Sequence, residues 1–446
     1  MAMSKKAHTY YKPVFVLALL LFINSLTAAW EYIKDHPTID FFAWWVVPHE
    51  LPSKYITNIY STSGQEELAK ALRQEFETSN ASQRQKELLQ ASEDLYNGKI
   101  SVPATPFFYA AFSLLVSDNY EYDQGKFIIL SLACFILSIL ILCRLLKYSY
   151  IATFLLASIF ISYYRPFISD LTVGNINQIQ LLMLSFFILL FVFSDKFFYS
   201  LCAGFVLGTA VMLKPNILMV LPFIVILSLF ERQFKEMFSL LLGFFLSAVL
   251  SFLTGIMYFR DSNIWMKWLS QLPHTLASYP IESGNASLAK ILFILTNLKF
   301  SVFIYLLIIF VFIYAILSSN HKISSNPSNL KSTQRFHDKK KIAGAFITTG
   351  FGCGSLLLGS EYVWLHYYTL LIPLIIFLIR PIYDDNNRIE INFTNKFFAF
   401  SAFTLFTEMI YGIFSKSVIN SAILVVLGTI ILLGSATYEM KEQALR

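Results

Sequence analysis

The sequence is poor in charged residues. Only 14% of its 446 residues are Asp, Glu, Lys or Arg, whereas soluble domains carry about 25%. Hydrophobic residues make up 56% of the chain and include 44 Phe and 24 Tyr. This is more apolar bulk than the surface of a soluble fold can hide, so the composition excludes an ordinary soluble domain.

Cysteine is also scarce, and several catalytic motifs are absent. The four cysteines, at 134, 143, 202 and 353, lie inside apolar runs without CxxC spacing. We therefore expect packing roles for them and neither disulfides nor a metal site. There is no HExxH motif, P-loop or serine elbow. The net charge of +6 does not indicate nucleic-acid binding, because the basic residues lie mostly in short loops, where they act as topology signals.

Long apolar runs recur along the chain instead. Runs of this length predict membrane-spanning helices rather than a barrel, because a helix satisfies its own backbone polar groups in lipid. The sequence therefore predicts an all-α, polytopic integral membrane protein in a single membrane domain. Twelve candidate spans are found, at 13–30, 123–146, 149–165, 177–194, 197–213, 216–230, 236–258, 296–318, 342–359, 364–380, 396–412 and 417–438.

The distribution of basic residues predicts the orientation. The first run could be a signal peptide, but its near-span length favours an uncleaved first helix. With twelve spans and a cytoplasmic N-terminus, both termini are cytoplasmic, and 19 of the 34 Lys and Arg fall in inside segments. This excess agrees with the positive-inside rule. The basic loop at 318–341, which contains "HDKKK", gives the strongest signal.

The first outside loop, residues 31–122, is the largest polar region. Residues 31–100 hold 7 basic and 11 acidic side chains. A capping box from Ser63 to Glu66 and a later stretch from Ser82 to Tyr96 predict two short amphipathic helices. We expect these to lie on the outer membrane surface. The run at 106–116 is too short to span and is expected to dip into the outer leaflet.

Several polar residues fall at the outer ends of spans, where ionisable side chains are functional candidates. They are Asp40, Arg165, Asp170, the amides of "GNINQIQ" at 174–180, Lys214, Glu361, Trp364, His366 and Tyr367. Each also has a simpler interpretation. Asp40 could be a solvated loop carboxylate, Lys214 a snorkelling lysine and Arg165 a helix-end cation. His366 could bond to backbone at the interface, and the amides could hold helices together.

This set of residues suits transfer from a phosphate-linked donor. A carboxylate can act as general base on an acceptor hydroxyl. Cations can hold the phosphate that leaves. A lipid-linked donor would require no nucleotide-binding domain, and the sequence shows none.

The order of these features resembles the GT-C glycosyltransferases, specifically glycosyltransferase family 87. That family has an aspartate in the first outside loop, a Gly-Gln-x-Asn element, a Lys-Pro and a Trp-x-His-Tyr element. This chain has "TIDFFAWW", "TVGNINQIQLLML", "GTAVMLKPNILMVLP" and "VWLHYYTLLIP" in that order. The resemblance covers roughly residues 13 to 380. Asn175 departs from it, since the family usually has Gln there, which leaves the contact of the shorter amide open.

The resemblance implies a GT-C helical membrane domain and inverting transfer of one sugar, such as mannose, from a polyprenyl-phosphate donor to a lipid or glycan acceptor. It places the enzyme in the bacterial plasma membrane, with no cofactor and no required metal. Asp40 resembles the catalytic base. The residues that would face the donor phosphate and sugar are Lys214, His366, Arg165, Asn175, Asn177, Trp364 and Tyr367.

Two other functions stay open at this stage. A flippase for lipid-linked sugars would show charged or broken helices near mid-membrane, often in two related halves. No internal repeat is evident, and the ionisable residues gather at the outer ends. An O-antigen-type polymerase would show a large arginine-rich outside loop late in the chain, whereas here the large loop is early and acidic.

Overall fold

The computed structural model describes residues 5–34, 36, 38–51, 58–79, 81–194, 196–277, 285–323, 333–383, 389–390, 393–407 and 418–443. The centre of the expected basic loop, residues 324–332, lies outside them. Within this part of the chain nearly all regular structure is helical, which confirms the expected all-α fold. The exception is a two-residue antiparallel ladder between β1 (Ile382–Tyr383) and β2 (Ile389–Glu390).

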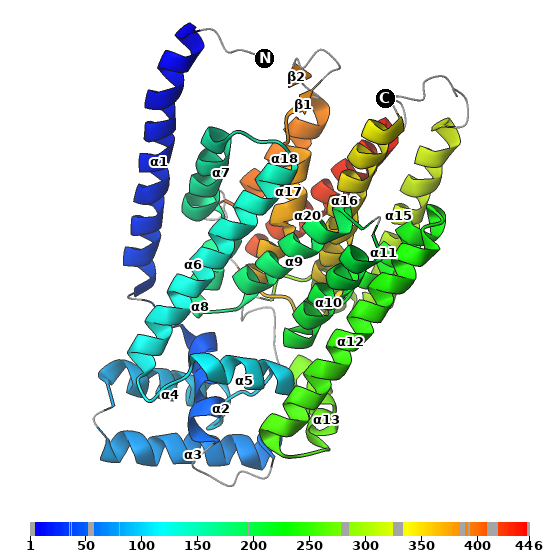
Figure 1. Cartoon of the computed structure of the whole chain (residues 1–446). Coiled ribbons are helices and arrows are strands. Elements are labelled where there is room, and N and C mark those ends of the chain that lie inside the picture. Colours follow the sequence, from blue (N-terminus) through cyan, green and yellow to red (C-terminus); the bar gives the residue numbers. More distant parts are fainter. Residues whose placement is uncertain are drawn as a thin grey trace.

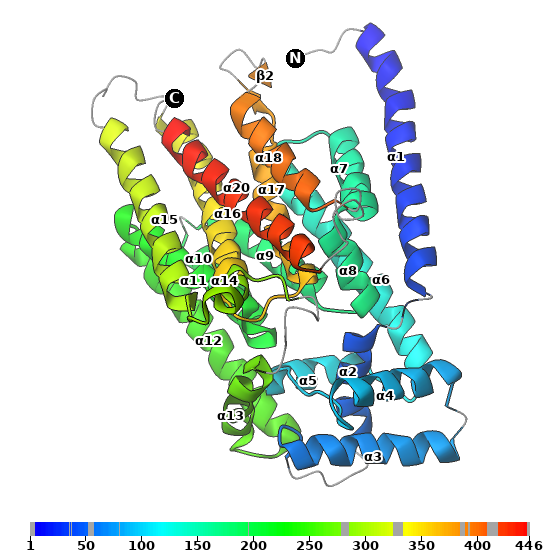
Figure 2. The same ribbon diagram turned by 180° about the vertical axis from the view of Figure 1, so that it is seen from behind.

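Most helices run side by side in one bundle (Figures 1 and 2). Among the described residues, six helices are long and apolar enough to cross a membrane, and each of the twelve expected spans contains helix. Several of the other segments are short: the 14 residues of α7 rise about 21 Å, less than the roughly 30 Å of a hydrocarbon core. The bundle consists of α1 (Lys5–Lys34), α6 (Tyr120–Leu145), α7 (Tyr150–Tyr163), α8 (Arg165–Val173), α9 (Asn177–Val192), α10 (Phe197–Leu213), η2 (Pro215–Ile217), α11 (Val220–Phe230), α12 (Phe234–Phe259), α14 (Leu288–Thr296), α15 (Ser301–Ile323), α16 (Thr333–Gly359), η4 (Leu365–Leu371), α17 (Ile372–Leu378), α18 (Phe393–Leu405) and α20 (Val418–Gln443).

A second layer of helices covers one end of the bundle (Figure 1). It is formed by α2 (Ile39–Glu50), α3 (Thr62–Thr78), α4 (Gln83–Leu95), α5 (Pro106–Phe112), η1 (Ser113–Leu115) and α13 (Ile264–Ala277). This layer has its own hydrophobic core, separate from the core of the bundle. The start of α1 and the end of α20 lie at the opposite end of the molecule (Figure 1).

The apolar faces of α3 and α4 pack into this second core. Leu68 and Leu72 on α3 are fully buried, in the same cluster as Trp45 of α2. The apolar faces of these amphipathic helices therefore contact protein, and the position of the helices on the outer membrane surface stays a prediction. The aromatic rings of α2 offer an apolar surface within the protein, so the apolar faces of α3 and α4 pack against it.

The start of one of these helices also differs from expectation. The N-cap of α3 is Ser61, whose hydroxyl accepts from the Gly64 N–H, so the helix begins before the expected Ser63 box. The expected α4 is confirmed: Ser82 and Gln85 form a reciprocal capping box.

A tight junction joins the two layers where α8 turns into α9. The turn residue Gly174 has φ of 72°, and a Cβ there would lie 2.8 Å from the Cβ of Phe41. Only glycine fits both the left-handed backbone and this close approach. Across the junction, the Thr38 N–H donates to the Thr172 carbonyl at 3.1 Å. The first turn of α2 is therefore held directly over the α8–α9 turn.

A close contact between α10 and α12 holds α10 in place. A Cβ at Gly204 would lie only 1.9 Å from the carbonyl oxygen of Leu240, so the two backbones nearly touch. Small residues allow this approach between membrane helices. The contact sets the course of α10, whose final cap is Lys214.

Candidate active site

Asp40 lies in the first turn of α2, above the α8–α9 turn. The preceding Thr38 adopts a left-handed conformation with φ of 49°, and its hydroxyl lies 3.0 Å from the Tyr120 hydroxyl. It also accepts from Gln124 at 2.7 Å. These contacts hold a strained residue in place, so the backbone that carries Asp40 is defined from two sides. The Asp40 side chain stays 32% exposed.

Asn175 connects Asp40 to the rest of the cluster. Its Nδ2 donates to Asp40 Oδ2 at 2.7 Å and to His366 Nε2 at 3.1 Å. Its Oδ1 accepts from Lys214 Nζ at 2.7 Å and from its neighbour's N–H at 2.8 Å. This amide orientation is the one that a lysine cation on one side and a carboxylate on the other require. The shorter Asn side chain therefore reaches all three groups.

His366 lies in η4, which is far along the chain from the other residues of the cluster. Its imidazole is buried, and Nε2 lies 4.0 Å from Asp40 Oδ2. Because Nε2 accepts an N–H from Asn175, the hydrogen-bond geometry corresponds to a neutral ring with its proton on Nδ1. The ring packs edge-on against Tyr367, with centroids 4.8 Å apart.

Lys214 closes α10 and is followed by Pro215, which ends the helix. Its Nζ lies 4.0 Å from the centre of the Tyr367 ring, a cation–π distance, and 3.5 Å from Asn177 Oδ1. Gln180 of α9 donates to the Lys214 carbonyl at 2.9 Å, which fixes the backbone. Burial lowers the pKa of Lys214, and the negative charges of Asp170 and Asp40 partly offset this.

Burial has the opposite effect on Asp40. It raises the pKa of the Asp40 carboxyl, while the hydrogen bond from Asn175 and the charge of Lys214 lower it in part. A carboxylate with a raised pKa is a stronger base than an ordinary aspartate. The cluster thus pairs an activated carboxylate with a cation.

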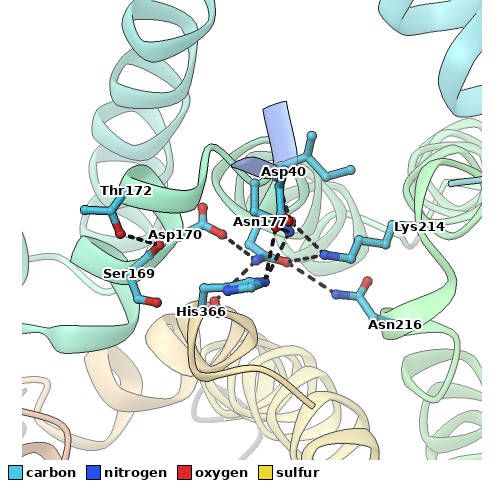
Figure 3. Close-up of polar contacts among 10 residues, drawn as sticks. Asp40, Ser169, Asp170, Thr172, Asn177, Lys214, Asn216 and His366 are labelled. Atoms are coloured by element: carbon cyan, nitrogen blue, oxygen red, sulfur yellow. Dashed lines mark hydrogen bonds and ion pairs between the residues drawn. The ribbon is translucent and has the colours of Figure 1, made fainter. Parts of the chain in front are cut away.

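Asn177 and Asp170 form the floor of the cluster. Asn177 Nδ2 donates to Asp170 Oδ1 at 2.5 Å and to the His366 carbonyl at 3.3 Å. Asn177 Oδ1 in turn accepts from Asn216 Nδ2 at 3.4 Å. Figure 3 shows the side chains of Asp40, Asp170, Asn177, Lys214, Asn216 and His366 gathered from α2, α8, α9, the end of α10, η2 and η4. The predicted site residues Asp40, Asn175, Asn177, Lys214, His366 and Tyr367 therefore lie together.

The other two predicted site residues make different contacts. Trp364 bridges through its backbone to Asn285, and its ring packs edge-on against Tyr362. Arg165 lines a cavity of about 330 Å³ between α1, α7 and α8. The cavity is lined by Ser25, Ala28, Ala29, Tyr32, Ile33, Ile161, Ser162, Arg165, Phe167, Ile168 and Leu171.

Sequence reasoning left Asp170 and Asn216 out of the site. Asp170 was noted as a charge after the third span, and its spacing to Asn177 carries no motif that sequence alone would single out. Asn216 directly follows the Lys-Pro pair, so its proximity to Lys214 was visible in the chain. Its bond to Asn177 depends on how α9 and η2 pack.

A second group of possible ligand atoms lies at the other end of α2. The side chains of His49, Glu50 and Glu75 bring one ligand atom each within 4.8 Å of the others. His49 Nε2 lies 3.1 Å from Glu75 Oε1, and the His49 ring stacks on Trp45 at 4.0 Å. Asp40 is in the first turn of α2, whereas His49 and Glu50 are in its last turn and Glu75 lies on α3, so this group is remote from the carboxylate of the cluster.

Comparison with known proteins gives one match. The profile described as "Glycosyltransferase family 87" matches residues 105–327. No curated protein and no solved structure matches the chain. The matched half of the chain carries Asp170, Asn175, Asn177 and Lys214, which form one side of the cluster, and the family resemblance seen in the motifs is thereby confirmed. The chain belongs to glycosyltransferase family 87 and is a multi-pass membrane glycosyltransferase.

Proposed function

We propose that this enzyme transfers a single sugar, a hexose such as mannose, from a polyprenyl-phosphate donor to a hydroxyl of a lipid or glycan acceptor. The observation that supports this most directly is the role of Asn175, which hydrogen-bonds Asp40, His366 and Lys214 at once. One amide thus holds a base next to a cation. This pairing is what displacement of a sugar from a phosphate requires.

Asp40 acts as general base in this reaction. Its carboxylate takes the proton of the acceptor hydroxyl as the hydroxyl oxygen attacks C1 of the sugar. The bond between C1 and the phosphate oxygen breaks, and its electron pair leaves with the polyprenyl phosphate. Attack from the face opposite the leaving group inverts the configuration at C1. The exposed part of Asp40 gives the acceptor access to the carboxylate.

Lys214 stabilises the leaving phosphate. The phosphate gains negative charge as the C1–O bond breaks, and a fixed cation lowers the energy of that state. Neutral His366 offers a polar group beside it, and the ring of Tyr367 keeps the ammonium in position. Asn175 and Asn177 present their oxygens to the same ammonium, so its position is set before the donor binds.

We place the reaction on the extracytoplasmic face of a bacterial plasma membrane. The helix ends that carry the cluster meet the α2–α5 layer, while the start of α1 and the end of α20 lie at the opposite end of the bundle (Figure 1). The excess of Lys and Arg in the segments at that opposite end supports cytoplasmic termini. A donor anchored in the outer leaflet then presents its phosphate at the depth of Lys214.

The proposal is tested by supplying radiolabelled polyprenyl-phosphate sugars to the purified protein together with extracted membrane lipids. A labelled lipid or glycan product supports the proposal, and its structure identifies the acceptor and the configuration at C1. A retained configuration, or transfer only from nucleotide sugars, would contradict it.

A further inference from the structure

Thr38 begins α2 in a way that departs from an ordinary helix cap. A threonine at this position usually has an extended backbone, and its hydroxyl accepts from a backbone N–H of the first turn. Thr38 instead has φ of 49° and ψ of 52°, and its side chain makes no capping hydrogen bond. A left-handed conformation is an outlier for a β-branched residue and costs free energy. The surrounding structure must therefore hold Thr38 in this conformation.

The hydroxyl of Thr38 binds to α6 instead of to its own helix. Gln124 Nε2 donates to it at 2.7 Å, and the Tyr120 hydroxyl lies 3.0 Å from it. Gln124 and Tyr120 are both buried, so water has little access to these bonds. One hydroxyl proton and two lone pairs are enough for both partners. Two side chains one turn apart on α6 thus hold the same atom of Thr38.

A second contact with α6 sets how α2 is turned about its axis. The Trp45 indole N–H donates to Asp123 Oδ2 at 3.0 Å, and both side chains are buried. Trp45 lies about two helical turns beyond Thr38, and Asp40 stands between them on α2. A helix held by side-chain contacts at two heights resists rotation about its axis. The direction in which Asp40 leaves α2 therefore depends on α6.

We propose that Gln124 and Tyr120 are positioning residues that hold Thr38 in its left-handed conformation and thereby aim the Asp40 carboxylate at the acceptor hydroxyl. The role of Asp40 as the base rests on the proposed function. The hold of Gln124 and Tyr120 on the first turn of α2 does not rest on it, because this hold is measurable in the protein without substrate.

Hydrogen–deuterium exchange of the purified protein in detergent, without substrate, tests the hold on α2. Gln124→Met keeps the length of the side chain and removes the donor, and Tyr120→Phe keeps the ring and removes the hydroxyl. The Phe42 N–H, which donates to the Thr38 carbonyl at 3.0 Å, reports on the first turn. In each variant we expect exchange at Phe42 to be about tenfold faster, the effect of losing one hydrogen bond. Wild-type exchange in both variants overturns the proposal.

Transfer from radiolabelled decaprenyl-phosphate mannose to extracted lipids in proteoliposomes tests the effect on the base. We expect kcat to fall about 10–100-fold in Gln124→Met with KM for the donor unchanged, because a small displacement of a catalytic group is costly. The same substitution in an Asp40→Asn enzyme should leave the residual rate unchanged, since the base is already lost. A structural role alone would slow both enzymes equally, and that result contradicts the proposal. Absence of transfer by the wild type would instead contradict the proposed function, and the exchange experiment would still decide the hold on α2.

Thr38 offers a matched pair of variants, which also covers the case in which Gln124→Met does not fold. Thr38→Ser keeps the hydroxyl, whereas Thr38→Val keeps the branched shape and loses it. We expect wild-type kcat in Thr38→Ser and a loss of about 10–100-fold in Thr38→Val. Tyr120→Phe should have no further effect in Thr38→Val, because its partner is already absent. Equal kcat in the two Thr38 variants, or additive losses in the double variant, would rule out the link through the hydroxyl.

Gln65→Met is the control for the amide substitution. Gln65 is also buried, and its Nε2 donates to the Tyr60 carbonyl at 3.4 Å, but it lies on α3 rather than on α6. This variant should leave both kcat and the exchange at Phe42 unchanged. Changes as large as those in Gln124→Met would show a general effect of removing a buried amide and would also overturn the proposal.

Discussion

Asp40 and Asn175 stand 135 positions apart in the chain, yet their side chains are joined by a 2.7 Å hydrogen bond. The contact exists because the first turn of α2 is held over the α8–α9 turn by the backbone bond between Thr38 and Thr172. The same amide accepts from Lys214 at 2.7 Å. The relative position of the base and the cation therefore depends on one side chain.

Replacement of Asn175 tests that dependence. Asn175→Leu keeps the size of the side chain and removes both hydrogen-bonding atoms, which leaves Asp40 and Lys214 without their shared partner. We expect kcat/KM for sugar transfer to fall by about 10–100-fold, because hydrogen bonds to charged groups contribute roughly 1.5–3 kcal/mol each. Initial rates in proteoliposomes measure this effect.

Asn119→Ala is the control for that experiment. Asn119 caps α6 through its side chain and lies outside the cluster, so its loss should lower thermal stability but leave kcat/KM unchanged. Wild-type kcat/KM in Asn175→Leu would show that the position of Asp40 does not depend on this amide.

The pH dependence of the reaction follows from the two opposite shifts at the site. Burial raises the pKa of Asp40, so activity should fall, as pH decreases, at a higher pH than for an ordinary aspartate. Burial lowers the pKa of Lys214, so the alkaline fall should come at a lower pH than for an ordinary lysine. The plot of kcat/KM against pH should therefore be bell-shaped, and narrower than for an aspartate and a lysine with ordinary pKa values. A rate that stays flat through the acid range would exclude Asp40 as the titrating base.

Substitutions of Lys214 and of Arg165 should differ sharply in their effect on kcat. Lys214→Gln removes the cation that contacts Asn175, and we expect kcat to fall by about 10²–10³-fold, as for other groups that stabilise developing charge. Arg165 lines a separate cavity beside α1, and Arg165→Gln should cost less than about tenfold. Parallel kinetics with varied donor concentration measure both. Equal losses in the two variants would place Arg165 in the phosphate site as well.

Gly174 connects the fold to the site. An alanine there meets Phe41 at 2.8 Å and must adopt φ of 72°, so Gly174→Ala should destabilise the protein by about 1–3 kcal/mol and move α2. Thermal melting in detergent and transfer rate should both fall. Gly125→Ala is the control, because a Cβ there meets nothing within 4 Å in the interior of α6. That variant should be as stable as the wild type or more so. A Gly174→Ala protein that melts and turns over like the wild type would contradict the packing.

The sequence predicted the helical membrane bundle because apolar length is a local property. Each of the twelve apolar runs contains helix. The length of individual helices was less predictable: the run at 149–165 yields α7, only 14 residues long, because the chain turns before Arg165 and Pro166. The side on which α3 buries its leucines depends on the rings of α2, a partner that its own periodicity does not name.

The sequence predicted part of the site because its polar residues fall at the ends of apolar runs, and the expected topology puts those ends on one side of the membrane. Asp40, Asn175, Lys214 and His366 were selected as polar residues at the ends of spans, and the structure brings them together. Asp170 was among the polar residues at span ends but was not assigned to the site, because its connection to Lys214 runs through Asn177, an arrangement that spacing does not encode.

Substitution of Asp40 itself tests the central claim. Asp40→Asn keeps the shape of the side chain and an acceptor for Asn175, but it cannot take a proton from the acceptor hydroxyl. Elution volume and melting temperature of the variant establish that it is folded, and retained binding of decaprenyl phosphate establishes that the donor side of the site is intact. Sugar transfer from the polyprenyl-phosphate donor is then measured in proteoliposomes. We predict a rate about 10²–10⁴-fold below that of the wild type; a rate equal to that of the wild type would contradict the assignment of Asp40 as the catalytic base.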